Sequence, residues 1–251
     1  MGTLLLKLAG PLQSWGADSR FTERKTRHEP TKSGVVGLLA SALGRKREEP
    51  IDDLAALPIA VRIDQPGRYE CDFQTAHTKK YDKKTQCWEF DKSLPLSKRY
   101  YLSDAVFVVG IEVADERLGE LANALVYPTF PLFLGRRSCP PVGKVLLGVR
   151  PGAALMDAMR EQPWEASDPR LIERHKHERC VRRELLRDRL FADETSQDGE
   201  LVRDYPLSYS QLYRRYEWRT VVHETPEVPN PYFVEAKPVP THDPMSVFEE
   251  A

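Results

Sequence analysis

The order of its apolar segments is the feature that most restricts how this chain can fold. Four short apolar stretches are typical of β-strands: 3–8, 59–64, 105–113 and 144–149. Helical spacing of apolar residues occurs at 30–44 and again in the segment after Asp115, which can cap that helix. The resulting β-α-β-β-α-β order predicts an α+β, ferredoxin-like (RRM-like) domain, with a four-stranded antiparallel sheet and two helices on one face. Many RNA-binding modules share this architecture.

The segment 30–44 carries the clearest helical pattern of the chain. Thr31 or Ser33 can cap its start, and Gly44 can end it. Lys32 and Ser33 lie at the helix start, where free backbone N–H groups favour an anion. Gly37 inside the helix indicates close packing against a neighbour. Apolar and polar residues alternate at 59–64, which predicts a half-buried strand with Arg62 and Asp64 on its charged face.

An insertion at about 65–98 interrupts the predicted domain. Hydrophobic periodicity fades there, and lysines stand beside aromatic residues. The lysines are Lys79, Lys80, Lys83 and Lys84, and the aromatics are Tyr81, Trp88 and Phe90. Loops of this length inside a compact domain are usually functional or disordered. We therefore expect a protruding basic arm, or thumb, which a hairpin could build.

The pattern divides the chain into three parts. Residues 1–150 form the expected RNA-binding domain, 151–225 a small accessory β-rich region, and 226–251 a proline-rich and acidic tail. The second part contains an expected short helix at 153–160 and strands at 201–209 and 218–222. The charged segment 169–190 fits either a helix or a hairpin.

The stretch 127–141 (YPTFPLFLGRRSCPP) has the composition of a rigid, shaped loop. Its prolines fix φ, and Gly135 permits a φ-positive turn just before Arg136 and Arg137. Arginine forks bind phosphate bidentately and stack on bases. The loop is therefore a candidate anion or RNA clamp. The alternative is a surface turn with two solvated arginines.

Composition narrows the class of protein. The 251 residues are 41% hydrophobic, enough for a real core, and the formal net charge is −1. Basic and acidic residues are segregated along the chain, which can create a positive groove on a neutral molecule. No apolar run approaches the ~18 residues of a membrane span. The four cysteines lack paired spacing, so we expect reduced, partly buried thiols and a cytoplasmic protein.

Single-stranded RNA is held by cationic tracks and aromatic platforms. The candidate donors to phosphates or base edges are Arg24, Arg27, Lys32, Arg99, Arg136 and Arg137. Ser33, Gly135 and Ser138 would complete the cradle. The candidate platforms are Trp15, Tyr100, Tyr101 and Tyr127, for which core packing is the alternative.

Catalytic and metal sites have weaker support. His28, beside the basic loop, is the best local candidate for a general base in RNA cleavage, but no partner to orient it is visible. His175, His177 and Cys180 could place three ligands together, but no fourth ligand stands at a zinc-like interval. No motif for nucleotide hydrolysis, metalloprotease or serine hydrolase chemistry occurs. We therefore expect no catalytic residue, metal or cofactor.

Four segments together resemble a known family. They are 4–16 (LLLKLAGPLQSWG), 30–44 (PTKSGVVGLLASALG), 99–107 (RYYLSDAVF) and 132–141 (LFLGRRSCPP), with a looser similarity at 203–219. They occur in the same order as in the CasD-type subunits of Cascade, the type I-E CRISPR surveillance complex. These subunits belong to the RAMP superfamily of ferredoxin-like RNA binders.

This resemblance implies a non-catalytic role in antiviral defence. Such a subunit caps the 5′ handle of crRNA and contacts the repeated backbone subunit and the large PAM-reading subunit. It meets target DNA indirectly, through the guide, and needs no membrane or small-molecule substrate. The insertion 65–98 matches the family's thumb by position. The alternative is a metal-independent endoribonuclease that processes precursor crRNA.

Overall fold

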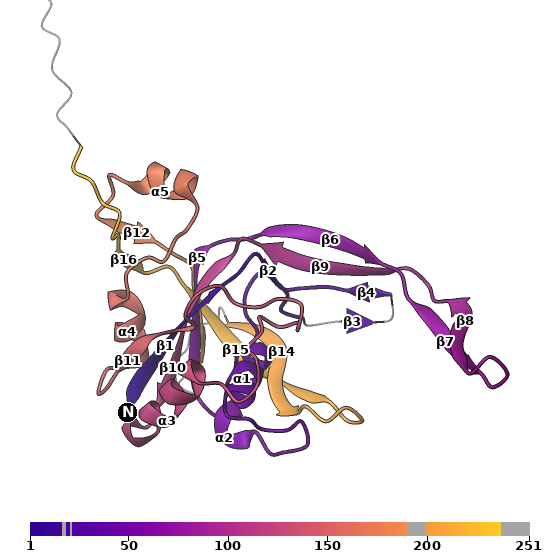
Figure 1. Ribbon diagram of the computed structural model, residues 1–251. Helices are drawn as coiled ribbons and strands as arrows, with labels where there is room; N and C mark the ends of the chain where they lie inside the picture. The colour runs from indigo at the N-terminus through magenta and orange to yellow at the C-terminus, as the bar shows by residue number, and fades with distance from the viewer. Residues whose placement is uncertain (17–18, 21, 190–198, 237–251) are drawn as a thin grey trace, which may run out of the picture.

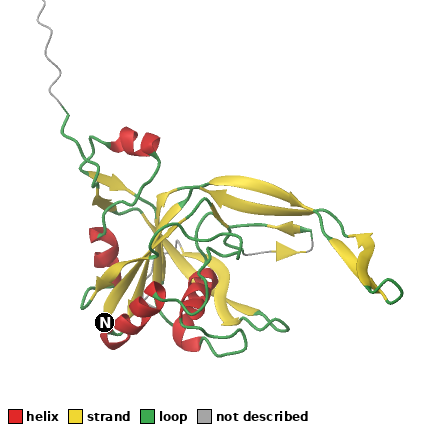
Figure 2. Ribbon diagram, viewed as in Figure 1, coloured by secondary structure: helices red, strands yellow, loops and turns green. Residues whose placement is uncertain are grey.

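A computed structural model describes residues 1–16, 19–20, 22–189 and 199–236. The fold is α+β and rich in strands (Figures 1 and 2). Its central sheet has seven antiparallel strands in the order β11-β1-β10-β5-β13-β15-β14. The strands are β1 (Gly2–Ala9), β5 (Ile59–Gln65), β10 (Val106–Val113), β11 (Leu146–Arg150), β13 (Leu185–Asp188), β14 (Gly199–Ser208) and β15 (Arg215–Glu224).

Helices cover the two faces of the sheet unequally. Side chains alternate between the faces of a strand, so Leu4, Leu6 and Leu8 of β1 face one way and Leu5 the other. The first three pack in one core with α1 (Lys32–Ala42) and α3 (Asp115–Val126). Leu5 packs instead with α4 (Leu155–Glu161), and α2 (Asp52–Ala55) is a single short turn. The predicted strands and helices of residues 1–150 are thus present, with small shifts of their ends.

The C-terminal strands correct one prediction. β14 and β15 do not form a separate accessory sheet, because β13 pairs with β5 and joins them to the central sheet. β13 has only four residues, LLRD, which is too short to show a strand pattern. No sequence pattern therefore indicates β13, the strand that connects β15 to β5.

The prediction for β5 was also wrong in one respect. The strand is buried along both faces, and Arg62 and Asp64 are both 0% exposed. Arg62 pairs with Asp64 at 2.6 Å and donates to the carbonyl oxygens of Met159, Gln162 and Pro163. Because these acceptors come from α4 and the turn after it, the burial of the charges depends on contacts distant in sequence.

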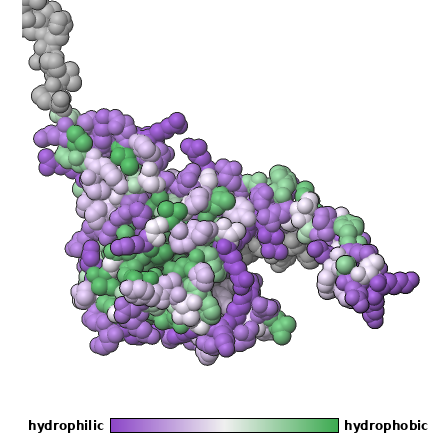
Figure 3. Space-filling view, in the orientation of Figure 1, coloured by the Kyte–Doolittle hydropathy of each residue, from purple (hydrophilic) through white to green (hydrophobic). Residues whose placement is uncertain are grey.

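The insertion forms an arm of two antiparallel strand pairs, one beyond the other, that projects from the body (Figure 1). β6 (Arg68–Gln74) pairs with β9 (Ser97–Ser103), and beyond them β7 (His77–Asp82) pairs with β8 (Cys87–Ser93). Nearly every residue of β6, β7 and β8 is exposed. Figure 3 shows a mostly hydrophilic arm surface interrupted by apolar patches. Short strands β2 (Leu12–Gln13), β3 (Ser19–Arg20) and β4 (Glu23–Arg24) complete the sheet around β9.

A small C-terminal unit contains the segment whose structure the sequence left open. It combines a helix and strands: α5 (Pro169–His175), followed by β12 (Cys180–Arg182), which pairs with β16 (Glu227–Pro229). Trp164, Val181 and Val228 form its own core. The predicted proline-rich tail lies mostly outside the described residues.

The candidate metal ligands of this unit have other partners. His175 contacts Glu178, and His177 lies 2.8 Å from the carbonyl oxygen of Val234. Within the described residues, no group of three or more His, Cys, Asp or Glu side chains could hold a metal ion. All four cysteines are free, but only Cys139 is buried, whereas partly buried thiols were expected. No helix in the described part of the chain is long and apolar enough to cross a membrane.

Candidate nucleic-acid interface

The loop 127–141, which we name the arginine loop, is fixed to the body of the protein at two buried positions. Leu134 and Cys139 are 0% and 1% exposed. The Leu134 N–H donates to the Cys139 carbonyl at 2.7 Å, and the Cys139 N–H donates to the Arg136 carbonyl at 2.9 Å. Gly135 has a φ of +82°, as the sequence predicted, and a Cβ there would lie 1.8 Å from the carbonyl oxygen of Ser14. The loop therefore needs glycine for two independent reasons.

The two adjacent arginines differ in environment. Arg136 is half-buried, and its guanidinium lies 4.7 Å from the centre of the Tyr101 ring. Its Nη2 donates to the carbonyl oxygen of Arg24 at 2.8 Å, while its Nη1 is buried with no hydrogen-bond partner in the described structure. Arg137 and Ser138 are exposed. Only Arg136 is thus held in one orientation, with a donor still unsatisfied.

Arg136 borders a concave site that we name the α1 cleft. This cavity of about 470 Å³ lies between the arginine loop, the exposed side of α1 and the β14–β15 hairpin. Six cationic residues line it: Arg45, Lys46, Arg47, Arg136, Arg203 and Arg214. No Asp or Glu is among its described lining residues. The cleft therefore has the charge and shape to hold a polyanion.

Small residues shape the wall that α1 presents to the cleft. Gly34 and Gly37 both line it, together with Ser33. Tyr209 lies against Gly37, where a Cβ would be 3.6 Å from the Tyr209 hydroxyl, and this hydroxyl donates to the Ser33 carbonyl. A Cβ at Gly37 would make only an ordinary van der Waals contact with Tyr209, so the expectation that Gly37 permits unusually close packing is not confirmed. Burial raises the pKa of Tyr209, so its phenol stays a neutral donor.

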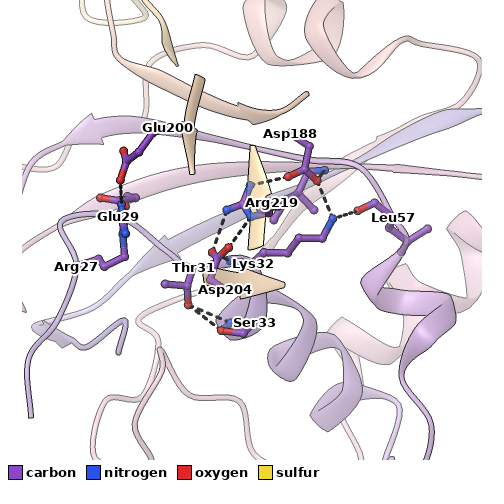
Figure 4. Close-up of polar contacts among 12 residues, drawn as sticks. Arg27, Glu29, Thr31, Lys32, Ser33, Leu57, Asp188, Glu200, Asp204 and Arg219 are labelled. Atoms are coloured by element: carbon purple, nitrogen blue, oxygen red, sulfur yellow. Dashed lines mark hydrogen bonds and ion pairs between the residues drawn. The ribbon is translucent and has the colours of Figure 1, made fainter. Parts of the chain in front are cut away.

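The start of α1 faces carboxylates of the protein itself and is not open to an external anion, contrary to the prediction that Lys32 binds RNA. The Lys32 N–H donates to the Asp204 carboxylate at 2.7 Å, and its ammonium pairs with Asp188 at 2.7 Å (Figure 4). Arg219 bonds to both carboxylates. Lys32 is 3% exposed, and burial lowers its pKa although Asp188 opposes the change. The helix start is thus occupied by the protein's own carboxylates, and Lys32 cannot contact RNA.

The four candidate aromatic platforms have different surroundings. Trp15 is 0% exposed and its Nε1 donates to Gln13, so it is a core residue and cannot stack on a base. Tyr101 is 5% exposed and lies beneath Arg136. Tyr100 is half-buried on β9, and Tyr127 is 81% exposed but does not line the α1 cleft. Only Tyr100 and Tyr127 keep a surface for stacking.

Three candidate arginines lie together beside the cleft. Arg24 and Arg99 are register partners on β4 and β9, and Arg136 bonds to the Arg24 backbone. The Arg99 Nε is buried without a hydrogen-bond partner in the described structure. Arg27, by contrast, pairs with Glu29 at 2.5 Å and Glu200 at 3.1 Å (Figure 4), so its charge is already neutralised.

Sequence reasoning missed part of the cleft. Arg45, Lys46 and Arg47 are consecutive basic residues in the sequence, but no sequence pattern ties them to the arginine loop. Arg203 and Arg214 lie in the segment 203–219, whose looser family resemblance was the one signal that could have identified them. Arg45 is oriented by Asp53, and this hydrogen bond lowers the Asp53 pKa to about 2.

The arm lysines and His28 lie outside the cleft. Lys79, Lys80, Lys83 and Lys84 are on the outer hairpin, where Tyr81 and Trp88 stack edge to face with ring centres 5.5 Å apart. His28 is exposed and meets the Tyr69 ring at 4.7 Å. Its ring has no hydrogen-bond partner within the described structure, and so no group that would orient it as a base.

Comparison with known proteins gives the family of the chain. The model of the Cas5 family of CRISPR-associated proteins matches residues 3–222. This chain belongs to the Cas5 family. Among curated relatives, the Cascade subunit CasD of Escherichia coli K12 is 32% identical over 157 residues, covering 58% of this chain and 70% of CasD.

Two solved structures resemble this Cas5 protein along most of its length. A chain of a CRISPR RNA-guided surveillance complex has a TM-score of 0.70 and 29% identity, covering 91% of both chains. The crystal structure of a Cas protein has a TM-score of 0.63 and 37% identity, covering 94% of this chain and all of that one. The family model, which matches through residue 222, includes β14 and most of β15, where the sequence resemblance was looser.

Proposed function

We propose that this Cas5-family protein is a non-catalytic RNA-binding subunit of a type I-E Cascade surveillance complex. Its similarity to E. coli CasD and to a chain of a CRISPR RNA-guided complex supports membership of such an assembly. The observation that carries the RNA-binding role is the α1 cleft, where six cations converge beside a rigid loop and no carboxylate competes within the described lining. Its ligand is the 5′ handle of crRNA.

The cleft and the surface beside it together supply the contacts that single-stranded RNA requires. Arginine and lysine bind phosphates, and exposed tyrosines stack on bases. From the predicted set we retain Arg24, Arg99, Arg136, Arg137, Ser33, Gly135, Ser138, Tyr100 and Tyr127, and we add Lys46, Arg47, Arg203 and Arg214. Arg45 also lines the cleft, but it is already paired with Asp53 and is not added. Trp15, Tyr101, Arg27 and Lys32 are removed, because each is buried or paired within the protein.

The architecture is consistent with this role. The order β11-β1-β10-β5, with α1 and α3 on one face, is the order of a ferredoxin-like domain, in which the C-terminal strands extend the sheet. The arm is the thumb of the subunit, and its lysines and exposed aromatics face the guide at the adjoining backbone subunit. The large PAM-reading subunit is the other protein partner, and target DNA is reached through the guide.

Binding of handle RNA to the full chain tests the proposal. Arg136→Ala should weaken binding by at least about tenfold, because it removes a charge-assisted contact inside the cleft. Arg137→Ala is the neighbouring control and should lose less, since Arg137 is exposed and does not line the cleft. Fluorescence anisotropy of labelled RNA measures both. Equal affinity of Arg136→Ala and wild type would contradict the site, and cleavage of the RNA would contradict the non-catalytic role.

A further inference from the structure

A second cavity lies at the base of the arm, separate from the α1 cleft. We name this cavity of about 610 Å³ the arm-base pocket. Its walls are the start of β6, the turn between β9 and β10, and α5 with the residues before it. None of its described lining residues also lines the α1 cleft. It is therefore a distinct candidate site.

Three arginines point to an anionic ligand for this pocket. Arg68, Arg170 and Arg174 line it, and all three are exposed. Within the described structure, none of their guanidinium groups has an ion pair or a hydrogen bond. Other cations of the same unit are paired, such as Lys176 with Glu173 and Arg182 with Glu227. Unpaired guanidinium groups around one cavity favour a phosphate group.

Asp104 gives the same pocket a hydrogen-bond acceptor. It adopts a φ of +55°, an uncommon conformation for a residue other than glycine. Its N–H donates to the Pro11 carbonyl at 3.3 Å and its own carbonyl accepts from Gln65, which hold the backbone there. Its carboxylate has no partner in the described structure. Such strained positions cluster at functional sites, and this one presents a free acceptor next to three arginines.

Gln65 fixes the distance between the two walls of the pocket. Its side chain is buried, and its Oε1 accepts from the N–H groups of Ser167 at 3.0 Å and Asp168 at 2.8 Å. Its Nε2 donates to the Asp104 carbonyl at 2.5 Å. Asp168 in turn accepts from the Arg170 N–H at 2.9 Å. Asp104 and Arg170 are therefore connected through a chain of hydrogen bonds before any ligand arrives.

We propose that the arm-base pocket binds one nucleotide of a single-stranded nucleic acid. The phosphate is held by Arg170 and Arg174 with support from Arg68, and Asp104 accepts from the exocyclic amino group of the base. A carboxylate pairs in this way with the N4 amino group of cytosine. This site is additional to the one proposed for the crRNA handle.

Photocrosslinking of the full chain tests the location. A cytosine-rich RNA carrying 5-iodocytidine should form adducts with peptides that contain residues 103–104 or 167–174, identified by mass spectrometry. Arg170→Gln with Arg174→Gln should lose these adducts. Arg179→Gln with Arg182→Gln removes the same charge from exposed positions outside the pocket and should keep them. Unchanged adducts in the first variant, or none in wild type, would overturn the proposal.

Two further variants separate base recognition and the handle site. Asp104→Asn adds an amide donor that suits uracil, so the ratio of affinities for C-rich and U-rich RNA should fall at least about fivefold. An unchanged ratio would contradict the role of Asp104. Arg136→Ala with Arg203→Ala should weaken handle binding yet leave the arm-base adducts at saturating RNA. Loss of those adducts would show that the arm-base pocket is not an independent site. Unimpaired handle binding in this variant would contradict the α1 cleft as the handle site but would leave the proposal for the arm-base pocket standing.

Discussion

At the scale of single residues, the interface depends on backbone positions as much as on charged side chains. Gly135 lets the arginine loop approach the Ser14 carbonyl, and this approach places Arg136 above Tyr101. The Arg136 guanidinium is then half-buried with one donor unsatisfied, so it gains more from a phosphate than a solvated arginine would. The position of one glycine thus determines the most constrained cation of the site.

Replacing Gly135 tests this dependence. Gly135→Ala should destabilise the protein by at least about 2 kcal/mol, because alanine is strained at positive φ and its Cβ would collide with Ser14. Gly143→Ala is the matched control, with a φ of +73° but nothing within 4 Å of the new Cβ, and should cost about 1 kcal/mol. Chemical denaturation measures both. An equal fall in the free energy of unfolding of both variants would mean that the close approach to Ser14 does not affect stability.

At the scale of elements, a buried ionic network joins α1 to the C-terminal strands. Lys32 and Asp188 are 156 residues apart in sequence, yet they pair in the interior, and Arg219 of β15 links Asp188 to Asp204 of β14. These contacts orient the β14–β15 hairpin against α1, and the α1 cleft lies between the two. The network therefore helps to shape the cleft without lining it.

Breaking this network should be costly. Lys32→Met retains the length of the side chain but leaves Asp188 buried with one cation fewer, so the free energy of unfolding should fall by about 3 kcal/mol. Lys7→Met removes the half-exposed pair with Glu165 and should cost less than about 1 kcal/mol. Urea titration of the two variants gives the comparison. Similar losses in both would show that burial does not distinguish the pairs.

The outer hairpin of the arm should be dispensable for folding. Gln74 and Ser97 are direct register partners, so an Asn-Gly turn can join them in place of residues 75–96. The melting temperature should change by less than about 2 °C, because nearly all the removed residues are exposed. Assembly with the backbone subunit and guide should be impaired. A large fall in melting temperature would show that the hairpin stabilises the body of the protein.

At the scale of the whole molecule, local sequence patterns predicted elements of secondary structure but not the contacts between residues distant in the sequence. Apolar spacing identified four strands and two helices among residues 1–150, and the proline and glycine content identified a shaped loop. Pattern alone could not show that β13 joins the C-terminal strands to the sheet, or that Asp188 and Asp204 occupy the start of α1. For the same reason Arg203 and Arg214 were missed, since they reach the cleft only through sheet pairing.

The salt dependence of handle-RNA binding tests the central claim most directly, that the α1 cleft neutralises RNA phosphates. Each phosphate contact on a single strand adds about 0.7 to the slope of log affinity against log salt. Replacing Arg136, Arg203 and Arg214 with glutamine should reduce the slope by about 2, whereas the same change at Arg150, Arg160 and Arg179, outside the cleft, should leave it unaltered. An equal slope for wild type and the cleft variant would contradict the account.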